Sequence, residues 1–182
     1  LLSKGKKPVS VEEEEEDKIW MGYNSEMEAI SFSNLKLNNN LQKTYKKYYA
    51  SALYNKSYFY LFSIKYEDAI SAAKQALSIH RELNNDVAIA GDLNIIANNS
   101  YKLGKIDEAL NYYKQAIDLS KRVNDQAGII NLYNNVSNLY FSVGDYKSAI
   151  AVLFEELKVA TEIGSNKDIG DAYNSIGGYY SL

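Results

Sequence analysis

Cysteine is absent from the 182 residues of this chain, and histidine and proline each occur once. Without cysteine there can be no disulfide, no thiolate-ligated zinc site and no cysteine nucleophile. The single histidine, His80, also excludes a cluster of histidine ligands, and no Ser or Asp forms a catalytic motif with it. We therefore expect no metal, no cofactor and no catalytic residue. The scarcity of proline leaves room for long uninterrupted helices.

The chain also lacks an excess of charge of one sign. Its 20 basic and 23 acidic residues give a formal net charge of −3, whereas nucleic-acid binding normally needs a concentrated basic face. We therefore expect no nucleic-acid partner. No run of residues approaches the roughly 18 to 20 apolar residues that span a bilayer, so we do not expect this chain to insert into a membrane. The absence of cysteine is compatible with both a cytoplasmic and a periplasmic location.

The residues that are present repeat at an interval of forty. Ala69, Ala109 and Ala149 occupy equivalent places in three copies. Within each copy, apolar residues are spaced at three and four, which predicts amphipathic helices. Gly104 and Gly144 separate two such helices, at a point where a helix end favours a left-handed residue. Each copy is therefore predicted to be a pair of antiparallel helices, which must stack on its neighbours to bury enough surface.

Polar residues between and within the helices have simple structural interpretations. The segments 84–86 and 124–125 contain turn residues and helix N-caps. His80 falls near the end of a helix, where a cation favourably faces the carbonyl groups. The spacing of the Asp and Glu residues is that of solvent-exposed helix faces.

The pattern resembles the tetratricopeptide repeat, in which large, small and aromatic residues mark the first helix and alanines and an aromatic mark the second. The clearest copy has Leu93, Ala97, Ala109, Tyr113 and Ala116. This resemblance implies an all-α fold, a right-handed α-solenoid of antiparallel helix pairs. The family's usual period is roughly 34 residues; the forty-residue form is similar to the repeats of bacterial regulators and sensors, and we expect longer helices from it.

Three regions are predicted along the chain. Residues 1–11 are expected to be a mobile lead-in, and residues 12–40 a degenerate first helix pair. Residues 41–182 are expected to form the repeat array, with about three full repeats and an unpaired final helix. An unpaired helix exposes apolar surface, so we expect either a longer chain or a terminus that another subunit covers.

The resemblance places a ligand on the concave side, which the first helices of the repeats line. Asparagines recur there, and a carboxamide can both donate to and accept from a peptide bond without reading a side chain. Asparagine is common throughout this chain, so the alternative that these residues are simply solvated stays open. The predicted ligand-binding residues are Tyr54, Tyr58, Asn94, Asn98, Tyr101, Asn134, Asn138, Phe141 and Asn174.

The predicted function is that of a non-enzymatic module that binds a protein or an extended peptide, as the sensing or interaction region of a larger bacterial signalling regulator. The predicted groove carries few charges and lacks the convergent Lys or Arg residues that would clamp a carboxylate, so a neutral or mildly apolar peptide is expected. The alternative is a structural scaffold that self-associates through its C-terminal helix.

Overall fold

The computed structural model describes residues 39–180, and in this range it has seven helices and no strand. Asn39 to Gln42 belong to one compact unit of the chain, and the other described residues belong to a second unit that begins at Lys43. The predicted regions 1–11 and 12–40 lie outside the described residues, except that Asn39 and Asn40 begin the first helix. The helices are α2 (Asn39–Phe62), α3 (Tyr66–Glu82), α4 (Asp86–Lys102), α5 (Ile106–Arg122), α6 (Gln126–Ser142), α7 (Tyr146–Glu162) and α8 (Asn166–Tyr180).

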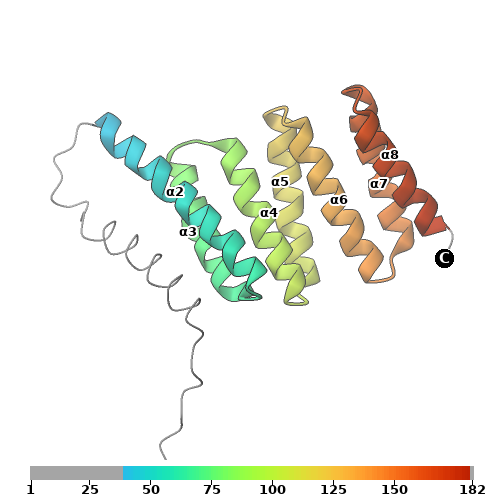
Figure 1. Ribbon diagram of the computed structural model, residues 1–182, viewed down its shortest axis with the longest axis horizontal. Helices are drawn as coiled ribbons and strands as arrows, with labels where there is room; N and C mark the ends of the chain where they lie inside the picture. Colours follow the sequence, from blue (N-terminus) through green and yellow to red (C-terminus); the bar gives the residue numbers. More distant parts are fainter. Residues whose placement is uncertain (1–38, 181–182) are drawn as a thin grey trace, which may run out of the picture. The chain divides into compact units, whose positions relative to one another are not determined.

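The helices repeat with the predicted interval of forty residues. Each helix from α3 to α7 has 17 residues and is followed by a three-residue turn. Consecutive helices from α3 to α8 pack side by side (Figure 1), and α4 also contacts α6 across the array. The all-α repeat fold is therefore confirmed, and the long period is explained by long helices.

A residue with a left-handed backbone conformation lies in the middle of every turn between described helices. In the turn after α4, the N–H of Gly104 donates to Tyr101 O and the N–H of Lys105 donates to Ser100 O, both at 2.9 Å. These bonds satisfy carbonyl groups that the helix end would otherwise leave unpaired. The residues with positive φ, between 53° and 81°, are Ile64, Asn84, Gly104, Asn124, Gly144 and Gly164.

Side chains cap the starts of α4 and α6, as predicted, whereas α3 and α5 have no side-chain cap. The side chains of Asn85 and Asp125 accept hydrogen bonds from the backbone N–H groups of Ala88 and Gly128, three residues on. Asp145 caps α7 in the same way. Such caps stabilise a helix by about 1 kcal/mol, and they fix the residue at which each helix begins.

Small residues bring the two helices of each pair close together. Ala69, Ala109 and Ala149 are fully buried, as expected for positions where helices approach most closely. The core is unevenly distributed along the array, because the buried residues of α8 are Ala172 and Ile176, whereas α4 buries nine residues. Helix α8 is therefore stabilised by less buried surface than α4.

Two further observations concern the described residues as a whole. None of their helices is long and apolar enough to cross a bilayer. No group of three or more His, Asp or Glu side chains among them is arranged to hold a metal ion.

Candidate functional site

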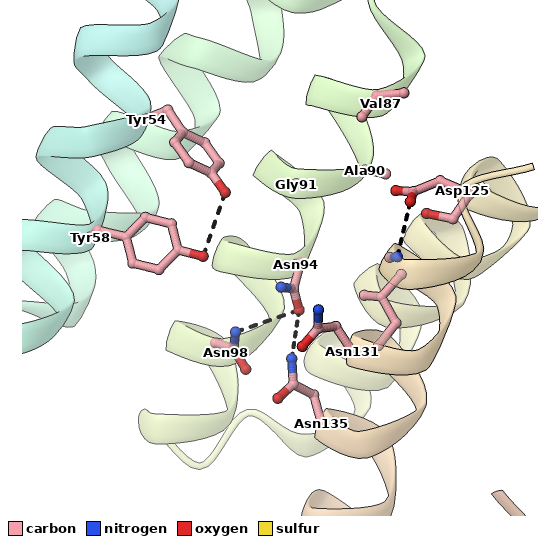
Figure 2. A pocket seen from close by; sticks show the side chains of 13 residues that line it. Tyr54, Tyr58, Val87, Ala90, Gly91, Asn94, Asn98, Asp125, Asn131 and Asn135 are labelled. Atoms are coloured by element: carbon pink, nitrogen blue, oxygen red, sulfur yellow. Dashed lines mark hydrogen bonds between the residues drawn. The ribbon is translucent and has the colours of Figure 1, made fainter. Parts of the chain in front are cut away.

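An open cleft of about 470 Å³ lies between α2, α4 and α6, which are first helices of successive repeats (Figure 2). Its walls come from α2 and α6, and one face of α4 forms its floor. Because these three helices are forty residues apart in sequence, the repeat itself brings their side chains together. The residues that line the cleft are Tyr54, Tyr58, Val87, Ala90, Gly91, Asn94, Asn98, Ser120, Asp125, Gly128, Asn131, Leu132 and Asn135.

The α2 wall of the cleft consists of two tyrosines, one helical turn apart. The rings of Tyr54 and Tyr58 meet edge to face with their centroids 5.2 Å apart, and their hydroxyl oxygens are separated by 3.5 Å. Tyr54 lies against Gly91, where a Cβ would come within 3.3 Å of its Cε2 atom. Burial raises the pKa of Tyr54, and Tyr58 and Asp92 raise it further, so its hydroxyl remains a neutral donor.

A chain of side-chain amides crosses the floor from α4 to α6 (Figure 2). Oδ1 of Asn94 accepts hydrogen bonds from Nδ2 of Asn135 at 3.0 Å and from Nδ2 of Asn98 at 3.5 Å. Oδ1 of Asn98 accepts in turn from the hydroxyl of Tyr113 at 2.5 Å. These bonds fix the orientation of each amide and occupy both ends of Asn98. The groups that they leave for a ligand are Nδ2 of Asn94 and Oδ1 of Asn135.

Asp125 is the one charged residue among the described residues that line the cleft. Its Oδ1 caps α6 by accepting from the N–H of Gly128 at 3.0 Å. Its Oδ2 lies over the Cα of Gly128, where an added Cβ would come within 2.2 Å of it. Glycine is therefore required at position 128 while the carboxylate keeps this orientation, and the cleft carries a net negative charge.

A second cluster of predicted residues lies between α6 and α8, outside the lining of the cleft. Nδ2 of Asn138 donates to Oδ1 of Asn134 at 2.8 Å, and the hydroxyl of Tyr179 donates to Oδ1 of Asn138 at 3.2 Å. The rings of Phe141 and Tyr179 stack with centroids 4.3 Å apart. The bond from Asn138 to Asn134 repeats the bond from Asn98 to Asn94 in the cleft, but the partner from the next first helix is here a tyrosine that binds Asn138.

The structure thus brings four of the nine predicted residues into one cleft: Tyr54, Tyr58, Asn94 and Asn98. Tyr101 is half-buried beside Lys102, whose Nζ lies 5.3 Å from its ring centroid. Asn174 is exposed on α8.

Asn131, Asn135, Gly91 and Asp125 were missed by the sequence prediction, which took the same face of every first helix. The contact between α4 and α6 instead joins positions 41 residues apart, as Asn94 and Asn135 show. An offset of 41 in the sequence was therefore the signal that could have identified Asn135.

His80 and Asp92 form a buried pair between α3 and α4. Nδ1 of His80 lies 2.6 Å from Oδ2 of Asp92, and the two residues are 4% and 0% exposed. His80 lies in the last turn of α3, as expected, but its burial against Asp92 was not predicted. It is buried because position 80 continues the buried stripe of Ala73 and Leu77. Burial raises the pKa of Asp92 to about 6, although His80 acts in the opposite direction.

Glu156 of α7 is the second buried acid, so the expectation of uniformly exposed acids is wrong at two positions. It is 1% exposed, and its Oε2 has no hydrogen-bond partner among the described residues. Burial raises its pKa to about 7, and the nearby carboxylates of Asp168 and Asp171 add to this effect. Neither buried acid lines the cleft.

A smaller hollow of about 370 Å³ lies on α3, α4 and α5. Its charges are mixed, with Arg81 and Arg122 beside Asp86 and Asp118. Nη2 of Arg122 lies 3.5 Å from Oδ2 of Asp86, so part of this charge is already paired within the chain.

Comparison with known proteins agrees with this architecture. The sequence profile of a family described as tetratricopeptide repeat matches residues 87–162. A comparison with curated proteins gives no match. Among solved structures, BtubC (BKLC) from P. vanneervenii is similar with a TM-score of 0.70 and 18% sequence identity, over 92% of this chain and 67% of that chain.

Two Rap protein structures are also similar. A Rap protein complexed with competence and sporulation factor has a TM-score of 0.63 and 22% identity, over 72% of this chain and 37% of that chain. The Rap conjugation gene regulator of the plasmid pLS20, in complex with the Phr* peptide, has a TM-score of 0.59 and 17% identity, over 82% and 42%. This chain therefore spans less than half the length of these two proteins. At such identities, the likeness is one of fold.

Proposed function

Because the tetratricopeptide-repeat profile matches residues 87–162 and the fold resembles that of solved repeat structures, we propose that this chain is a non-enzymatic module that binds an extended protein segment, within a larger signalling regulator. The observation that carries this proposal is the cleft between α2, α4 and α6, which combines an aromatic wall with oriented amide groups. Pockets that bind ligands usually combine apolar walls with a few well-placed polar groups.

The amides provide a way to hold a peptide backbone. Nδ2 of Asn94 can donate to a peptide carbonyl, while Oδ1 of Asn135 can accept from a peptide N–H. The hydrogen bond between the two side chains, 3.0 Å long, keeps this donor and acceptor next to each other before a ligand arrives. Preorganised groups lose less conformational entropy on binding. The paired amides should therefore bind an extended peptide backbone more tightly than two freely rotating amides would.

The length of the ligand follows from the spacing of the helices. Packed helices lie about 8 to 10 Å apart, and an extended chain covers roughly 3.3 to 3.6 Å per residue. A segment of about six residues would therefore cross from α2 over α4 to α6. Its side chains would alternate between the wall formed by Tyr54 and Tyr58 and the solvent.

The comparisons give independent support to this proposal. A Rap regulator of similar fold is in complex with the Phr* peptide, so the fold is compatible with peptide binding. The remaining predicted residues, Tyr101, Asn134, Asn138, Phe141 and Asn174, remain part of the proposal for a longer segment that reaches from the cleft towards α8.

The experiment that tests the proposal is a binding titration with a double variant. Asn94→Ala combined with Asn135→Ala removes the donor and the acceptor together, so neither amide is left without its partner. We expect binding of capped heptapeptides to weaken by about tenfold, the value of one or two hydrogen bonds, with little change in thermal stability. Asn55→Ala combined with Asn111→Ala is the matched control, since both residues are exposed and outside the cleft. Equal affinity of the two double variants would contradict the proposal.

Self-association is the second candidate function, and the exposed tyrosines of α8 favour it. Tyr173 and Tyr180 are 60% and 69% exposed, and aromatic residues are enriched in interfaces. Sedimentation velocity at several concentrations separates the two candidates. A constant monomer excludes the scaffold, whereas a dimer that dissociates in the Tyr173→Ser variant supports it.

A further inference from the structure

We infer that the segment bound in the cleft carries a lysine or arginine side chain, which lies between the two tyrosines of α2 and the carboxylate of Asp125. This inference rests on the proposed function and specifies its ligand. It replaces the expectation of a neutral peptide, which was based on groove positions that did not include Asp125.

The charge of the cleft lining is the first argument. Asp125 is charged, and no lysine, arginine or histidine is among the described residues that line the cleft. The second nearby acid, Asp92, is bound to His80, so we attribute the charge of the cleft to Asp125 alone. The N-terminus of α6 offsets part of this charge, but the cleft lining offers no basic side chain to pair with it, so the cleft attracts a cation and repels an acidic segment.

The orientation of the carboxylate is the second argument. One oxygen of Asp125 is committed to the helix cap, while Oδ2 lies over a residue that has no side chain. The corresponding positions of α4 are Asn85 and Ala88, and those of α8 are Ser165 and Asp168. Of the three helices α4, α6 and α8, therefore, α6 at the cleft combines an acidic cap with a glycine three residues on.

The tyrosine wall is the third argument. Tyr54 and Tyr58 present two aromatic rings in an edge-to-face arrangement, and a cation is attracted to the face of such a ring. Their hydroxyl oxygens also accept hydrogen bonds from an ammonium or guanidinium group. The long alkyl stem of lysine or arginine can contact the rings while the charged end reaches the carboxylate.

The probes for the test are three capped heptapeptides of alanine and serine that differ in their central residue, which is lysine, norleucine or glutamate. Binding of each to the full chain is followed by NMR titration. We expect the lysine peptide to bind about fivefold to tenfold more tightly than the norleucine peptide, the value of a charge-assisted contact in an open cleft. The glutamate peptide should bind most weakly.

The decisive variant is Asp125→Asn, because asparagine caps a helix as well as aspartate does but carries no charge. It should abolish the preference for the lysine peptide over the norleucine peptide. Asp145→Asn is the matched control, since Asp145 caps α7 in the same way outside the cleft and its loss changes the net charge equally. The control should keep the full preference for lysine.

The outcomes distinguish this inference from the proposed function. If all three peptides bind equally and Asp125→Asn has no effect, the inferred basic side chain is refuted, while the proposal of peptide binding stands. If the preference for lysine is lost equally in Asp145→Asn, overall charge and not the cleft is responsible, which also refutes the inference. If no peptide binds at millimolar concentration, the proposed function fails together with it.

Discussion

Nδ1 of His80 lies 2.6 Å from Oδ2 of Asp92, and this contact joins two buried polar side chains within an otherwise apolar packing of α3 against α4. The positions equivalent to this pair hold Ser120 and Leu132 forty residues on, and Ala160 and Ala172 after eighty. The fold therefore does not require an acid and a base here. Both members of the pair change together along the array.

We predict that each of the two side chains is needed only while the other is present, and that the pair as a whole adds little to the free energy of unfolding. Asp92→Leu or His80→Ser alone leaves one buried polar group without its original partner and should lower the free energy of unfolding by about 3 kcal/mol. The double change to His80→Ser and Asp92→Leu, as in the next repeat, should stay within about 1 kcal/mol of the original. Urea unfolding of the four proteins measures this coupling. Additive losses in the double variant would show that the two side chains act independently.

The second prediction concerns Glu156, which stands where the other repeats have Ala76 and Ala116. Its pKa is raised from 4.5 to about 7 in the folded protein, so the folded state holds the proton more tightly than the unfolded state. This stabilisation is complete below about pH 4.5 and is lost as the pH rises to about 7.

Glu156→Gln is neutral at every pH and should therefore be more stable than the original protein at pH 8, by up to about 3 kcal/mol. The difference should shrink towards zero near pH 4.5. Lys167, whose Nζ lies 2.8 Å from Oδ2 of Asp171, is the basic residue paired with one of the two neighbouring carboxylates. Urea unfolding at pH 4.5 and pH 8 provides the measurement, and a difference that does not vary with pH would refute the buried titration.

The third prediction concerns the turn between α2 and α3. Ile64 has a φ of 60°, a conformation that costs a β-branched residue about 1 to 2 kcal/mol. Its side chain is 72% exposed, so replacement loses little packing. Ile64→Gly should raise the free energy of unfolding by about 0.5 to 1 kcal/mol, after the greater freedom of glycine in the unfolded chain is subtracted.

The equivalent residue Gly104 provides the reciprocal control for this turn. An added Cβ meets nothing within 4 Å, so Gly104→Ala changes the backbone preference alone and should destabilise by about 1 kcal/mol. Thermal unfolding followed by circular dichroism records both shifts. The same sign for the two variants would contradict the interpretation.

The fourth prediction concerns the support of the cleft from beneath. Tyr113→Phe removes the hydroxyl that donates to Oδ1 of Asn98, which costs about 1 kcal/mol of stability and frees the amide of Asn98 to rotate. We expect a loss of peptide affinity of about twofold to threefold, because one polar group is held less firmly before binding. Tyr112→Phe on the same helix is the control, and an equal loss in both would assign the effect to the helix and not to the amide.

Much of the fold could be predicted because the residues that repeat every forty positions determine the structure of their own short segment. The alanines at 69, 109 and 149 mark close helix contacts, and Gly104 and Gly144 mark turns, so the helices follow from short-range rules. The turn residues Asn84 and Asn124 take the same left-handed conformation as the glycines, as asparagine more readily does than other residues.

The site could be predicted only in part, because a cleft depends on how neighbouring helices are offset. Tyr58 and Asn94 were found from their helical face, but Asn135 is reached through the 41-residue offset between α4 and α6. The burial of Asp92 and Glu156 was missed for a different reason. Helical spacing alone does not distinguish a charged residue on the buried face from one at its edge, and burial of an acid depends on partners in another helix.

The most direct test of the account is a map of backbone amide NMR shifts as the lysine heptapeptide is added to the chain. We predict that the largest shifts fall on Gly91, Asn94, Gly128 and Asn135, around the cleft. Shifts concentrated instead at Arg81 and Arg122, in the hollow on α3 and α5, or at Tyr173 of α8, would contradict it.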